Sequence, residues 1–321
     1  MNNTLDRFRG AWLGSMLGSS IELRKGVGKA YGHKNNEAWL QFFMVREQLA
    51  EIAIESQRLN AEAIADLLVE RQMGDRSSVL AEYSYCLLSL LPLIIFYGDN
   101  WNLLQKIVRK YYLKLGSLSN SLELEADTLL WSYLISSIFH SGLELNGGHF
   151  SQLARQILNN MAVKKTALIG QLEIVITAIE RGVSLQQLSD ELLPRGNNVQ
   201  RAIALSCYCF ATTATDFKLS VQRASNIDPE IARLATALTG TLSGAYNGMA
   251  GIPLSWKKMA KQDIAYSLAS QTTLKLFRAW LGVYPVGNEL SSNIEIEAIA
   301  IPSLIQTRKT LKIISQKSLF N

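Results

Sequence analysis

The chain has 321 residues, 48% of them hydrophobic, and its formal net charge is +5. Such a chain can bury a substantial core, as one large domain or two ordinary ones. The last 21 residues hold four bases and no acid, which leaves +1 for residues 1–300 and argues against a basic stripe that binds a specific nucleic acid. These four bases are Arg308, Lys309, Lys312 and Lys317.

The cysteines and the apolar runs indicate the cellular compartment in which we expect the protein. Cys86, Cys207 and Cys209 all lie in apolar stretches that favour helix, and an odd number does not form a disulfide framework. The first residues lack a signal-peptide pattern, and the longest apolar run, 86–97, is shorter than the roughly 20 residues that span a bilayer. We therefore expect a cytoplasmic protein without a transmembrane segment, with Cys207 and Cys209 in its core.

Apolar residues recur at spacings of three and four, and prolines are few, which predicts an all-α fold. The first helix is expected to begin after Asn3-Thr4, a capping pair. A long helix should follow Gly74 and bend near Pro92, because proline removes a backbone donor. The other helices expected in the first half of the chain cover about 37–58, 60–71, a stretch after Asn100, and 122–141.

The second half continues with helices expected near 150–180, 184–193, 199–213 and 216–225. Asp228-Pro229 then marks a strong helix start. In the helix that follows, glycines recur every four residues and share one face, so a neighbouring backbone can approach closely. These glycines are Gly240, Gly244 and Gly248.

Beyond about residue 282 the helical pattern ends. Residues 282–293 read as a loop, and the alternation over 294–301 favours a short strand. We therefore expect one helical domain over 1–281 and a C-terminal extension over 282–321. The basic amphipathic segment 302–321 is a candidate contact for an anionic membrane surface or an acidic partner.

Three segments resemble, in order and spacing, the ADP-ribosylglycohydrolases, which are DraG-like, all-helical, dimagnesium enzymes that remove ADP-ribose from proteins. They are Asp6-Arg7-Phe8-Arg9-Gly10 through Gly18, the helix start Gly74-Asp75-Arg76-Ser77, and Arg223-Ala224-Ser225-Asn226 followed by the glycine series and Ile252-Pro253. The resemblance spans roughly residues 4–280. It implies a single compact helical domain with a site between two helix starts.

The family holds two magnesium ions between a Thr-Asp-Asp start and an Asp-x-Asp-Thr start, and this chain departs from both. At the first start, Asp75 matches the first aspartate and Ser77 keeps a hydroxyl group, but Arg76 replaces the second aspartate. Magnesium prefers carboxylate oxygens, and a like charge nearby opposes its binding.

At the second helix start, counting back from Gly240 puts Ile231 and Arg233 at the two aspartate positions and Leu234 at the threonine. The nearest acids, Asp228 and Glu230, have the right separation but stand three residues early, about 4.5 Å along a helix. The amino-terminal Gly-Asp pair of the family is Gly18-Ser19 here.

These losses predict a catalytically degenerate member of the family with a binding or scaffold role and no standard dimagnesium centre. An ADP-ribose or nucleotide cleft can persist, with Arg76 and Arg233 meeting phosphates. The alternative is an active hydrolase with a rearranged, metal-poor site, in which Asp75, Asp228 and Glu230 hold one magnesium ion that activates water. A third reading is a structural subunit that binds a protein partner.

Overall fold

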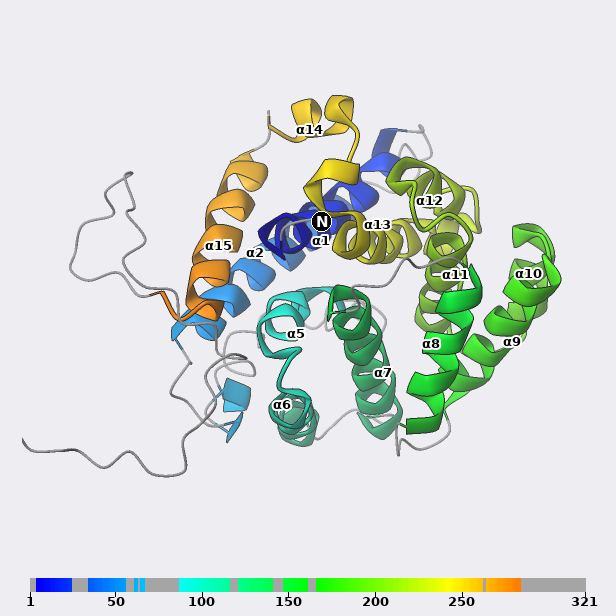
Figure 1. Ribbon diagram of the computed structural model, residues 1–321, viewed down its shortest axis with the longest axis horizontal. Coiled ribbons are helices and arrows are strands. Elements are labelled where there is room, and N and C mark those ends of the chain that lie inside the picture. Colours follow the sequence, from blue (N-terminus) through cyan, green and yellow to red (C-terminus); the bar gives the residue numbers. More distant parts are fainter. Residues whose placement is uncertain are drawn as a thin grey trace, which may run out of the picture. The chain divides into compact units, whose positions relative to one another are not determined.

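The computed structural model describes most of the first 283 residues (Figure 1). The described ranges are 4–24, 34–55, 61–62, 64–66, 87–115, 121–140, 147–160, 166–261 and 264–283. The chain divides into two compact units, Met1–Phe277 and Arg278–Asn321. In the second unit the described residues are 278–283, the end of helix α15 followed by Gly282, whose φ of 74° is left-handed.

The all-α prediction is confirmed, because every regular element in the described ranges is a helix. The helices are α1 (Thr4–Arg24), α2 (Lys34–Glu55), α5 (Leu91–Tyr97), α6 (Trp101–Leu115), α7 (Ser121–His140), α8 (Gly147–Asn160), α9 (Ala167–Arg181), α10 (Leu185–Leu192), α11 (Asn198–Thr212), α12 (Phe217–Ala224), α13 (Pro229–Gly251), α14 (Leu254–Ala260) and α15 (Ile264–Trp280). The expected helix start at Gly74, the strand at 294–301 and the segment 302–321 lie outside the described residues. The predicted domain boundary after residue 281 stays a prediction.

Local sequence explains several helix ends. Ser184 and Asn197 each form a capping box. The side chain of the capping residue accepts the backbone N–H three residues later, and the glutamine side chain at that position accepts the backbone N–H of the capping residue. Asp228 caps α13 directly before Pro229. The break expected near Pro92 is found at Leu90, and α5 begins at Leu91 with the proline in its first turn.

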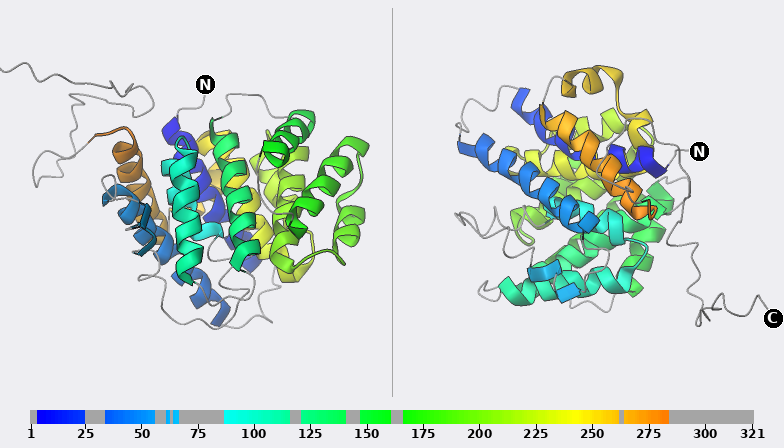
Figure 2. Two further views of the ribbon diagram at one scale, coloured as in Figure 1. Left: turned by 90° about the horizontal axis from the view of Figure 1, so that it is seen from below. Right: turned by 90° about the vertical axis from the view of Figure 1, so that its left-hand side faces the viewer.

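The centre of the first unit is the crossing of α1 and α13, which run side by side and antiparallel (Figures 1 and 2). Gly10 lies against the carbonyl of Gly244, Gly14 against that of Gly240, and Gly18 against that of Thr236. A β-carbon at these glycines would collide with backbone on the other helix. The expected close approach to the glycine face of α13 is therefore confirmed, with α1 as the neighbour.

The glycine series ends at a kink in α13. Gly248 has φ 65° and ψ −171°, a conformation that L side chains rarely adopt, and it lies beside Asp6 at the start of α1. Around the crossing, α11 and α12 pack on α13. One core cluster joins α1, α12 and the end of α13, and it consists of Leu13, Leu17, Phe217, Val221 and Ile252.

Candidate functional site

The helix pairing fixes where the Gly18-Ser19 pair lies. Gly18 lies against the backbone of Thr236 and Ala237, about two turns after the start of α13. Ser19 is buried, and its hydroxyl group donates to the carbonyl of Met16 at 2.8 Å, within its own helix. Asp75, Arg76 and Ser77 lie outside the described residues, so the first helix start of the motif is not placed.

The carboxylate of Asp228 is engaged at both oxygens. Oδ1 accepts the backbone N–H of Glu230 at 3.0 Å, which caps α13, and Oδ2 accepts Nη2 of Arg201 at 3.3 Å. The Arg201 side chain, on α11, is only 5% exposed. A charge buried to this degree depends on its counterion, so Asp228 fastens the start of α13 to α11.

Asn198 extends this arrangement into a four-residue cluster. Its Oδ1 accepts Nη1 of Arg201 at 3.1 Å, and its Nδ2 donates to the exposed carboxylate of Glu230 at 3.3 Å. We call Asn198, Arg201, Asp228 and Glu230 the latch. Both acids that the sequence offered as metal ligands belong to the latch, so a metal ion would compete with these hydrogen bonds for their oxygens.

The three motif positions of α13 carry no carboxylate. Ile231 and Leu234 are buried, at 2% and 8% exposure, and both belong to the core. Arg233 is partly buried, and loss of solvation lowers the pKa of its guanidinium to about 10. At the positions that the sequence analysis assigns to two acids and a hydroxyl group, this helix presents two apolar side chains and a cation.

A second buried charge lies on the other side of α1. Arg46 on α2 is fully buried, its Nη1 donates to Ser15 Oγ at 2.6 Å and to the Trp12 carbonyl at 3.3 Å, and its guanidinium lies 4.6 Å from the Trp12 ring centroid. Nη2 is 3.8 Å from Oε1 of Glu47, the oxygen that accepts the Trp12 indole N–H. Burial lowers the pKa of Arg46 to about 10.

Sequence reasoning missed both buried arginines, although a signal was present. Arg201 precedes the apolar run 202–205, and Arg46 follows the apolar run 42–45. When a single charged residue stands beside such an apolar run on a core helix, its side chain is expected to be buried. A buried charge requires an ion-pair or hydrogen-bond partner.

No group of three or more His, Cys, Asp or Glu side chains that could hold a metal ion occurs in the described ranges. Cys207 and Cys209 are buried in α11, as expected, and burial raises the pKa of each thiol to about 12. Helices long and apolar enough to cross a membrane are also absent from this part of the chain.

The fold and the site region together define an all-α protein in which the glycine-rich helices α1 and α13 pack together and Asp228 caps the start of α13. The family model described as ADP-ribosylglycohydrolase matches residues 43–283, well over half of the chain. The chain therefore belongs to the ADP-ribosylglycohydrolase family. The match begins within α2 and does not include α1. No curated protein matches the sequence.

Proposed function

We propose that this protein is a catalytically inactive member of its family, which binds ADP-ribose or a related nucleotide and serves as a binding or scaffold protein. The start of α13 carries the proposal. There the motif positions hold Ile231, Arg233 and Leu234, and the nearby Asp228 is occupied by its helix and by Arg201. A reducing cytoplasm suits such a protein, because its core thiols are unpaired.

Charge opposes a dimagnesium centre at this place. Magnesium is held through carboxylates, and it needs near-ideal octahedral geometry. A guanidinium about 4 Å from the ion would cost about 4 kcal/mol for each unit of ionic charge at an intermediate dielectric. With Arg233 at one motif position and Arg76 at another in the sequence, the site selects anions over cations.

The same cations suit a pyrophosphate. A guanidinium donates two parallel hydrogen bonds to phosphate oxygens, and it is less strongly hydrated than an ammonium group.

Isothermal titration calorimetry separates the proposal from standard family chemistry. We expect heat on titration with ADP-ribose and none with magnesium chloride. Arg233→Ala should weaken ADP-ribose binding roughly tenfold, since a hydrogen bond to a charged group contributes about 1.5–3 kcal/mol. Arg195→Ala, at an exposed arginine of the same unit, is the matched control and should bind as the wild type does. Tight binding of two magnesium ions with release of ADP-ribose from a modified protein would refute the proposal.

The alternative is a working hydrolase with one metal ion on Asp75, Asp228 and Glu230. One observation favours it, because Glu230 is exposed and shares a helix start with Asp228. This arrangement requires Asp228 to release Arg201. It predicts magnesium-dependent turnover of ADP-ribosylated protein that Glu230→Ala and Asp75→Ala both abolish, and absence of turnover in the wild type would leave it without support.

A further inference from the structure

Helices α12 and α14 meet through one aromatic contact and a shared core cluster. The rings of Phe217 and Trp256 meet edge to face, with centroids 5.9 Å apart, and Ala260 packs on the same cluster. Because Trp256 and Ala260 turn inward, the exposed positions 254, 258 and 261, on the opposite side of the helix, turn outward. The inner sides of both helices are thus committed to the core.

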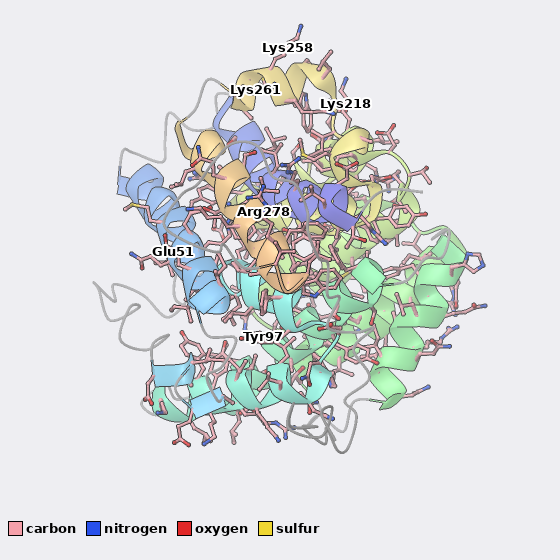
Figure 3. All side chains as sticks on the ribbon, turned by 60° about the vertical axis from the view of Figure 1, so that its left-hand side comes forward. Glu51, Tyr97, Lys218, Lys258, Lys261 and Arg278 are labelled. Carbon is pink, nitrogen blue, oxygen red and sulfur yellow. The ribbon has the colours of Figure 1, made fainter. Side chains whose placement is uncertain are left out.

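The outward side chains of the two helices form one surface, which we call the α12–α14 face. It consists of the exposed side chains Lys218, Leu219, Leu254, Lys258 and Lys261. The two leucines are 44% and 65% exposed, respectively. Figure 3 shows the three lysines gathered at the top of the view. Cations and protruding apolar side chains are therefore interspersed there.

The charge of the face is strongly one-sided. Residues 254–261 contain three lysines and no acid. Lys257 is used internally, since its Nζ donates to the Met249 carbonyl at 2.7 Å. The acid on this part of α12 is Asp216, which caps the helix by accepting the Leu219 N–H at 2.9 Å. Among the described residues of the two helices and their caps, one carboxylate accompanies three exposed lysines, and the next acid after α14 in the sequence is Asp263, so the face carries a net positive charge that favours an anionic partner.

We propose that the α12–α14 face docks on an anionic lipid surface. Lysines gain from the potential of an acidic leaflet, while exposed leucines can enter the boundary between headgroups and acyl chains. A nucleic-acid surface would be expected to offer aromatic side chains for stacking, but Trp256 is packed against Phe217. Each lysine contributes roughly fivefold in partitioning, so the contact is peripheral and reversible.

Vesicle co-sedimentation with the full chain tests the proposal. We expect binding to vesicles of phosphatidylglycerol and phosphatidylcholine, and little to phosphatidylcholine alone. The variant Lys218→Glu/Lys258→Glu/Lys261→Glu should reduce partitioning at least on the order of 100-fold. The control Lys106→Glu/Arg181→Glu/Arg195→Glu changes the total charge equally at exposed sites elsewhere, and it should lose far less. Leu254→Ser should weaken binding several-fold while keeping every charge.

The outcomes distinguish this face from other sources of binding. If the two triple variants lost vesicle binding equally, net charge alone would explain the binding, and the proposal would be overturned. Binding that survives the first triple variant and disappears when residues 302–321 are deleted would also overturn it. If the chain bound DNA or an acidic protein more tightly than anionic vesicles, that molecule would be the partner of the face and the lipid proposal would be wrong. The proposal does not depend on the nucleotide cleft, because ADP-ribose affinity should be unchanged in the lysine variant.

Discussion

Two buried arginines show how a single side chain can determine which helices contact each other. Arg201 and Arg46 are both buried, and each is held by side chains or carbonyls of another helix. Burying a charge is costly, so each arginine ties its helix to a definite partner. The partner of Arg201 is Asp228, which the alternative one-metal hydrolase would use as a ligand. A metal ion at that carboxylate would have to displace Arg201.

Arg46 offers a direct test of this dependence. Arg46→Met keeps an apolar stem but leaves Glu47, which is only 12% exposed, without its cation, so we expect a loss of about 3 kcal/mol in the free energy of unfolding. Adding Glu47→Gln keeps an acceptor for the Trp12 indole and should recover at least half of that loss. Urea denaturation measures both variants, with Met44→Ala as an exposed control on α2. A double variant as unstable as the single one would exclude charge compensation as the role of Arg46.

At the scale of elements, the α1–α13 crossing depends on glycine. A β-carbon at Gly14 would lie 2.9 Å from the carbonyl carbon of Gly240 and 3.1 Å from Phe217 Cε2, so the helices must separate. We expect Gly14→Ala to cost about 3 kcal/mol in the free energy of unfolding. Gly170→Ala is the matched control, since nothing lies within 4 Å of its β-carbon, and it should stabilise α9 by up to about 1 kcal/mol. Thermal denaturation of the two variants should thus shift in opposite directions.

The same crossing shows which features the sequence could predict. Glycines four residues apart share a helix face, and Asp228-Pro229 starts a helix, because both rules act within one segment. The contact of Arg201 with Asp228 joins residues 27 positions apart, and that of Arg46 with Ser15 joins residues 31 apart. Such pairs depend on how separate helices pack. Sequence periodicity therefore predicts which face of a helix is buried, but it does not predict which residues of another helix contact that face.

At the scale of the whole molecule, the framework and the motif are separable. The glycine register places Gly18-Ser19 against α13 about two turns after its start, while the motif positions at that start hold Ile231 and Arg233. The crossing itself packs backbone and small residues, while Ile231, at one of the positions that the sequence assigns to the motif, is buried in the core. The helix pair therefore forms without a carboxylate at that position.

If the framework still supports a metal site, restoring the acids should restore metal binding. In Arg76→Asp/Ile231→Asp/Arg233→Asp, new carboxylates with no counterion should lower the melting temperature in EDTA, because Ile231 is buried. Magnesium at about 100 times its dissociation constant would then stabilise the variant by about 2.7 kcal/mol. The asparagine triple variant, Arg76→Asn/Ile231→Asn/Arg233→Asn, matches the shape without the charge and should not respond. Since the wild type lacks these acids, its melting temperature should be the same in EDTA and in magnesium. A magnesium-induced rise in the wild type equal to that of the aspartate variant would instead mean that the present side chains already hold the ion, as the alternative hydrolase requires.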